Sequence, residues 1–224
     1  ADLPAKQQAG QTPTLEELQL LANTGSKSKE PATYLIAMEN LVRYYPSDDY
    51  WIDLLGRVQG KAGYSDRFAL DVLRLQFKAV STMPERDYSD MAEIALANAF
   101  PTEAKKVLDA GYAKGLLGTG ANAAKHKRLR DQANKAAADD VKSIANGEAA
   151  ANKSKDGTGL INLGYAYVTM DQFDKGIDLI QKGIAKGGLK RPEDAKLRLG
   201  YSYAMAGKKD DAIKVLETVK GGDG

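Results

Sequence analysis

The chain of 224 residues contains no cysteine and a single histidine, His126. The lack of cysteine excludes disulfide bonds, thiolate catalysis and metal sites with sulfur ligands, but it does not fix the compartment. No stretch approaches the roughly 20 consecutive apolar residues that a membrane-spanning helix needs. We therefore expect no membrane span, and the sequence gives no reason to expect a bound metal or a cofactor.

The chain also lacks an excess of charge of either sign. It carries 32 Lys and Arg against 30 Asp and Glu, which gives a net charge of +2. Binding to nucleic acid phosphates needs basic residues concentrated on one face, whereas acidic residues are interspersed here almost throughout. We expect no nucleic-acid partner, and the apolar share of 43% is that of an ordinary globular protein.

Apolar residues recur at spacings of three and four along most of the chain, as they do on one face of an amphipathic helix. Leu35, Met38, Leu41 and Val42 show the pattern, and Pro46 ends that helix. No window shows the alternation of a strand. The sequence predicts about ten helices joined by short loops. The residues expected at or near helix starts are Thr14, Asp48 or Asp49, Asp66, Ser89 and Pro101.

One pattern repeats at a distance of 36 positions in the C-terminal third. The Leu-Gly-Tyr of residues 163–165 returns at residues 199–201, and each copy is followed by a second tyrosine two positions on. Further along, Gly176 and Ala212 are small residues that each precede a large apolar one by four positions. This order is typical of stacked helical hairpins, because small residues let two helices cross closely and the large residue fills the interface.

These motifs resemble the tetratricopeptide repeat family, in which a first helix carries Leu-Gly and an aromatic residue and a second helix carries small, large and small residues. The two strong copies cover residues 157–220, and a weaker copy covers 88–114, with Met91 and Ala92 at the Leu-Gly positions. The resemblance implies an all-α fold, a right-handed α-solenoid of antiparallel helical hairpins. It also implies a role in protein-protein interaction rather than catalysis.

Between the weak copy and the strong pair lies an alanine-rich stretch with high helix propensity and few large apolar residues. It predicts one long helix, or two, that interrupts the stacking of hairpins. The expected organisation is a loose lead-in (1–14), an N-terminal array of divergent hairpins (15–120), the alanine-rich helix and linker (121–156), the two repeats (157–220) and a tail (221–224).

Five residues of the two repeats are candidates for a peptide-binding groove. The resemblance places Tyr165 and Tyr201 on the face that lines a concave groove, although packing between repeats would explain them equally well. Asn162 and Arg198 stand where some family members grip a peptide's terminal carboxylate, but Asp194 replaces the expected lysine and would repel a carboxylate. The candidates are Asn162, Tyr165, Thr169, Arg198 and Tyr201.

Other groups that could carry chemistry have simpler interpretations. His126 lies in a basic run, 125–130, without a carboxylate spaced to orient it, so we expect an exposed residue on a solvated helix face. The run itself could also meet an acidic partner or a lipid head group. The glycines of 115–120 lack the ending of a phosphate loop, and the paired acids at 139–140 and 210–211 lack a third metal ligand.

The leading hypothesis is a non-enzymatic scaffold that binds a peptide or protein surface in the groove of its repeats. The alternative is a structural or assembly segment of a larger bacterial cell-envelope protein. Such a segment would dock or self-associate through an uncapped C-terminal hairpin, because no polar closing helix follows residue 220. The start of the chain, residues 1–4, suggests a processed product, and a periplasmic location is slightly favoured over a cytoplasmic one.

Overall fold

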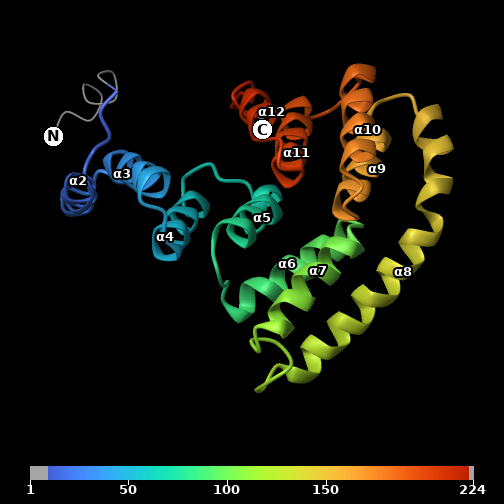
Figure 1. Cartoon of the computed structure of the whole chain (residues 1–224), viewed down its shortest axis with the longest axis horizontal. Coiled ribbons are helices and arrows are strands. Elements are labelled where there is room, and N and C mark those ends of the chain that lie inside the picture. The colour runs from blue at the N-terminus through green and yellow to red at the C-terminus, as the bar shows by residue number, and fades with distance from the viewer. Residues whose placement is uncertain (1–9, 222–224) are drawn as a thin grey trace. The chain divides into compact units, whose positions relative to one another are not determined.

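The computed structural model describes residues 10–221, which form helices and connecting loops without any strand in that range (Figure 1). The prediction of an all-α protein is confirmed, and consecutive helices pack against one another as in a helical repeat. The chain divides into two compact units, residues 1–91 and 92–224. None of the helices in the described range is long and apolar enough to cross a membrane.

The first unit begins with a capped helix. Thr14 accepts the backbone N–H of Glu17 at 3.2 Å, and the Glu17 carboxylate accepts the N–H of Thr14 at 2.9 Å, so the predicted cap is confirmed. The helices of this unit are α2 (Leu15–Lys27), α3 (Pro31–Tyr44), α4 (Asp48–Gln59), the 3-10 turn η1 (Asp66–Phe68), α5 (Ala69–Ala79) and the start of α6 (Glu85–Ala97).

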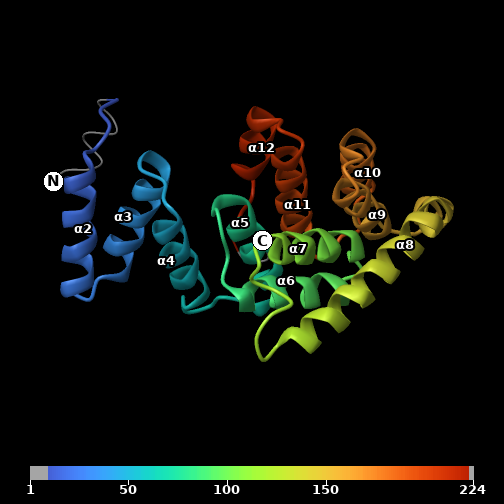
Figure 2. The same cartoon turned by 60° about the horizontal axis from the view of Figure 1, so that its bottom comes forward.

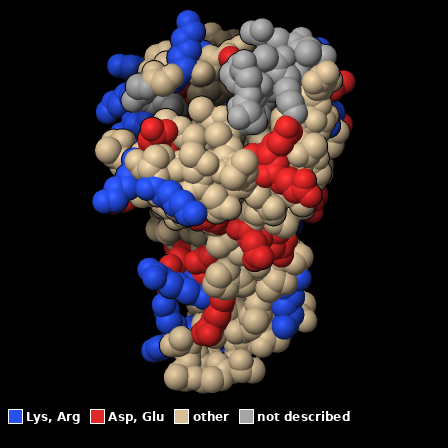
Figure 3. Space-filling view, turned by 90° about the vertical axis from the view of Figure 1, so that its left-hand side faces the viewer, with Lys and Arg blue, Asp and Glu red and all other residues tan. Residues whose placement is uncertain are grey.

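The predicted helix start at Asp48 or Asp49 is confirmed, because α4 begins at Asp48. Its cap is the preceding Ser47, whose hydroxyl accepts the N–H of Tyr50, and the two acids form the first turn. The prediction for Ser89 is wrong: this residue does not open a helix but is buried inside α6, which has already begun at Glu85. On the face shown in Figure 3, acidic and basic side chains both occur and neither covers the surface continuously.

The second unit holds the two strong copies of the repeat and most of the weak copy, of which residues 88–91 belong to the first unit. Its helices are the rest of α6, α7 (Pro101–Ala113), α8 (Ala123–Lys153), α9 (Thr158–Thr169), α10 (Phe173–Lys186), α11 (Pro192–Met205) and α12 (Lys209–Leu216). The division between the two units falls inside α6, and α8 packs against both α7 and α9. The organisation expected from the sequence, with an N-terminal array that ends at residue 120, stays a prediction.

The alanine-rich stretch forms one helix of 31 residues rather than two, visible as the long α8 in Figures 1 and 2. Three of its six buried side chains are alanines, which let neighbouring helices approach its axis. They recur on one face of the helix: His126, Leu129, Ala133, Ala137, Ile144 and Ala151. The helix is therefore a long wall against which α7 and α9 pack.

The glycines of the repeat lie where two helices cross closely, as predicted. A Cβ atom added to Gly164 would lie 2.5 Å from the carbonyl oxygen of Gly176 and 2.8 Å from Cγ1 of Ile180. In the last hairpin, a Cβ atom on Gly200 would lie 2.5 Å from Cγ of Leu216. Both hairpins, α9–α10 and α11–α12, thus depend on a missing side chain in the first helix.

Candidate functional site

Three depressions on the second unit adjoin one another along α8, α9 and α11. The first, about 680 Å³, lies between α8 and the end of α6. The second, about 460 Å³, lies between the C-terminal part of α8, α9 and the loop before α7. The third, about 640 Å³, lies between the starts of α9 and α11. Ala99 lines the first and the second, and Asn162 lines the second and the third, so the three depressions are neighbours on the surface. Together they are called the groove.

The first depression is acidic. Its described lining contains Glu93, Asp139 and Asp140 and no basic residue. Glu93 is paired with Lys125 at 2.8 Å, whereas no ion pair is recorded in the described range for the carboxylates of Asp139 and Asp140. Burial raises the pKa of Asp140. A cation that entered this depression would therefore meet carboxylates that are not already neutralised.

The second depression is built from small and apolar residues. Ala99, Gly147, Ala150 and Gly159 leave space between α8 and α9, and no charged residue belongs to its described lining. Ala150 is exposed, so a larger side chain at that position would project into the space rather than into the core. Such a passage can admit an extended backbone with modest side chains.

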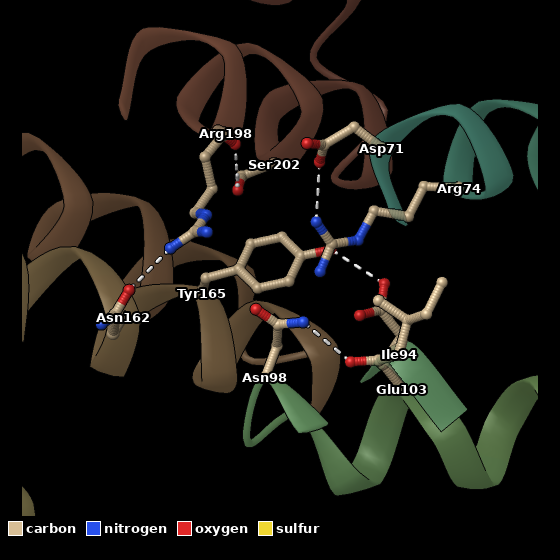
Figure 4. Close-up of polar contacts among 9 residues, drawn as sticks. All are labelled: Asp71, Arg74, Ile94, Asn98, Glu103, Asn162, Tyr165, Arg198 and Ser202. Atoms are coloured by element: carbon tan, nitrogen blue, oxygen red, sulfur yellow. Dashed lines mark hydrogen bonds and ion pairs between the residues drawn. The ribbon is translucent and has the colours of Figure 1, made fainter. Parts of the chain in front are cut away.

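Two amide side chains also line this second depression. Nδ2 of Asn98 donates to the carbonyl oxygen of Ile94 at 2.8 Å, and Oδ1 of Asn162 accepts from Arg198 at 2.7 Å (Figure 4). Asn98 thus uses its amide nitrogen and Asn162 its amide oxygen. The amide oxygen of Asn98 can still accept from a ligand, and the amide nitrogen of Asn162 can still donate to one. The N–H and C=O groups of a peptide require this combination of an acceptor and a donor.

The third depression is lined by three basic residues, Lys190, Arg191 and Arg198, and by two acids, Asp156 and Asp194. The carboxylate of Asp156 accepts the backbone N–H of Thr158, the first residue of α9, at 2.8 Å. This hydrogen bond, together with attraction from Lys186 and Lys190, lowers the pKa of Asp156. The N-terminal ends of α9 and α11 add partial positive charge, so this part of the groove favours anions.

Asn162 and Arg198 are brought together at the groove. The hydrogen bond between them bridges α9 and α11, and the guanidinium of Arg198 lies 5.5 and 5.4 Å from the ring centres of Phe100 and Tyr165. Asp194 lines the same depression. A peptide carboxylate at this point would compete with Asn162 for Arg198.

Tyr165 and Thr169 do not face the groove, contrary to the expectation for these candidates. Their exposed fractions are 0% and 2%. The hydroxyl of Tyr165 donates to the buried carboxylate of Glu103 at 3.0 Å (Figure 4). Its ring packs edge-on against Phe100, with the ring centres 4.9 Å apart. For Tyr165 the structure shows packing, the second of the two interpretations left open by the sequence.

The remaining candidate, Tyr201, is half-buried beside Tyr165, with ring centres 6.5 Å apart. It does not belong to the described lining of the three depressions. Of the second tyrosines in the two copies of the repeat, Tyr167 is buried and Tyr203 is half-buried. The aromatic positions of the repeat therefore support the helices beneath the groove instead of forming its surface.

Sequence reasoning missed most of the groove. The acids at 139–140 were considered only as metal ligands, and the helix that carries them was interpreted as an interruption of the repeats. The small residues of α8 at the groove, such as the half-buried Gly147 and the exposed Ala150, were the available signal. They could not be recognised as a groove wall without knowing that α9 packs beside them.

His126 is buried, with an exposed fraction of 1%, so the expectation of an exposed histidine is wrong. Its Nδ1 accepts the backbone N–H of Gly118 at 3.2 Å. Gly118 has a φ of 82°, a left-handed conformation that lets the loop after α7 turn back onto α8. The histidine thus joins this loop to the helix, and it lines none of the three depressions in the described range.

Replacing His126 with alanine is expected to lower the free energy of unfolding by about 1–2 kcal/mol, because the buried ring and the hydrogen bond to Gly118 are lost. Urea unfolding followed by circular dichroism measures the change. Arg128→Ala is the matched control on the exposed face of the same turn and should change stability by less than about 0.5 kcal/mol. Equal effects of the two substitutions would show that His126 does not hold the loop.

No group of three or more His, Cys, Asp or Glu side chains in the described range could hold a metal ion. Comparison of the chain with protein-family models and with curated proteins gives no match. The resemblance to tetratricopeptide repeats therefore rests on the repeated residues and on the hairpins that they form.

Proposed function

We propose that the chain is a non-enzymatic interaction scaffold that binds an extended segment of a protein partner in the groove of its second unit. The observation that carries the proposal is the contiguity of the three depressions, joined at Ala99 and Asn162. In the same proposal, the hairpins belong to a right-handed α-solenoid of the tetratricopeptide type, whose stacked helices offer such a surface.

The length of the groove suits a peptide better than a small molecule. Asp140 and Ala151, which line its first and second parts, are separated by roughly 16 Å along α8 at 1.5 Å per residue. About five residues of extended chain cover that distance, and the third depression lengthens the groove further. An extended segment also presents N–H and C=O groups along its length, which Asn98 and Asn162 can pair with.

Ala150→Trp is expected to abolish binding, because the indole would fill the second depression and interrupt the groove. A phage-displayed library of random peptides of about 12 residues is selected against the wild type and the variant. We expect enriched peptides for the wild type and a loss of at least about tenfold in their capture by Ala150→Trp, a cost above about 1.4 kcal/mol.

Ala149→Trp is the matched control, since Ala149 is exposed on the same helix but does not belong to the described lining of the groove. It should capture the same peptides as the wild type. The proposal fails if the wild type enriches no peptide, or if both tryptophan variants remain folded and bind equally well.

A further inference from the structure

The two ends of the groove differ in charge, and an uncharged passage separates them. Three carboxylates and no basic residue line the described part of the first depression. Three basic residues and two acids line the third. The second depression has no charged residue in its described lining. A ligand that lies along the whole groove must therefore pass from an acidic to a basic environment.

The acidic end has carboxylates available to a ligand. Asp139 and Asp140 are neighbours on α8, so their charges repel each other. Of the three acids, Glu93 is the one with a recorded ion pair in the described range, to Lys125. The raised pKa of Asp140 reflects its partial removal from water, a cost that a bound ammonium or guanidinium group would offset.

The basic end already stabilises a carboxylate of the chain itself. The Asp156 side chain is held by the N–H of Thr158, and its pKa is lowered. Lys190 and Arg191 are exposed in the loop before α11, and no ion pair is recorded for either in the described range. These two cations, with the N-terminus of α11, are placed to meet a ligand's acidic side chains.

The two ends act on different parts of a ligand. The stretch from Asp140 to Ala151 alone spans roughly 16 Å, and the basic depression lies beyond it. The screening length at physiological salt is about 8 Å. Charges at one end are thus largely screened from those at the other, so each end can select its own portion of the bound segment.

We infer that the groove selects extended segments of divided charge, which have basic residues at one end and acidic residues at the other. The basic residues lie at Glu93, Asp139 and Asp140, and the acidic residues lie at Lys190, Arg191 and Arg198. This inference rests on the proposed function and names its ligand class. Net charge does not decide recognition, because a segment of this kind can be neutral overall. The order of charges along the segment decides it.

Three blocked peptides of about 12 residues test this inference. Each has a neutral middle of glycine, alanine and serine, and the charged ends are basic and acidic, both acidic, or both basic. Fluorescence anisotropy with the full chain should show the basic-and-acidic peptide binding at least about tenfold more tightly than either of the others. The double variant Asp139→Lys, Asp140→Lys should instead prefer the peptide with two acidic ends.

Asp210→Lys, Asp211→Lys is the matched control, since it replaces a pair of adjacent, exposed acids on α12 and changes the net charge equally. It should keep the wild-type order of affinities. If it changes that order as much as the variant on α8 does, net charge alone governs binding and the inference is wrong.

Failure of the inference and failure of the proposed function give different results. If all three peptides bind the wild type equally well and none binds Ala150→Trp, the groove is the binding site but does not select for divided charge. This result keeps the proposed function and overturns the inference. If none of the three peptides binds, the peptides enriched from the phage-displayed library are compared instead. Enriched sequences in which basic and acidic residues are not separated overturn the inference. A library that yields no enriched sequence overturns the proposed function itself.

Discussion

Gly164→Val is expected to lower the free energy of unfolding by about 3 kcal/mol or more. Its first added carbon would lie 2.5 Å from the carbonyl oxygen of Gly176 and 2.9 Å from the backbone nitrogen of Ile180. Both are backbone atoms of α10, so no side-chain rotation relieves the contact. The two helices of the hairpin would have to separate, and the fully buried Ile180 would lose its packing.

Gly147→Val is the matched control, because Gly147 is also a helical glycine of the second unit. An added Cβ atom there meets Leu163 Cδ1 at 3.6 Å, an ordinary van der Waals distance. The exchange should change stability by less than about 1 kcal/mol, since valine has a slightly better helix propensity than glycine. Circular dichroism during urea unfolding measures both variants. Similar stabilities would show that the α9–α10 hairpin tolerates a side chain at its crossing point.

Tyr165→Ala is expected to cost about 3–5 kcal/mol, because it removes a completely buried aromatic ring. The ring contacts Phe100, and its hydroxyl donates to the buried Glu103. Tyr165→Phe should cost about 1–3 kcal/mol, since it keeps the ring but removes one hydrogen-bond donor from a buried carboxylate. Differential scanning calorimetry measures both changes.

Tyr203→Phe separates the role of burial from the loss of a hydroxyl. Tyr203 is half-buried and accepts an exposed hydrogen bond from Gln181 at 2.9 Å. Its exchange should cost less than about 0.5 kcal/mol. If Tyr165→Phe were equally mild, the bond to Glu103 would not stabilise the fold. Because of its buried position, an exchange at Tyr165 tests folding, and Ala150→Trp is the better test of binding.

Features that depend on neighbouring residues could be predicted from the sequence. The capping box at Thr14, the long alanine-rich helix and the proline at the start of α7 follow from local propensities and hydrogen bonds. The repeat of 36 positions also predicted the close helix crossings at Gly164 and Gly200, because a glycine at a fixed place in a hairpin has a packing reason.

Features that join distant parts of the chain could not be predicted in this way. Tyr165 and Glu103 are 62 positions apart, and nothing in the sequence indicates that this acid accepts a buried hydrogen bond. His126 lies in a run of basic residues, which suggested exposure, yet the preceding loop covers it. The bond to Glu103 and the burial of His126 could not be predicted because the environment of a side chain depends on elements that are not its sequence neighbours.

The sequence by itself determined that the chain is helical, that its last third contains two matching hairpins, and which glycines allow their helices to cross. Periodicity and backbone sterics act over a few residues, so they can be read without coordinates. Only the tertiary structure decided which residues face the groove. It turned Tyr165 and Thr169 inward and placed Asp139, Asp140 and Ala150 of α8 on the groove, because the surface of a helix becomes a wall only when another helix packs beside it.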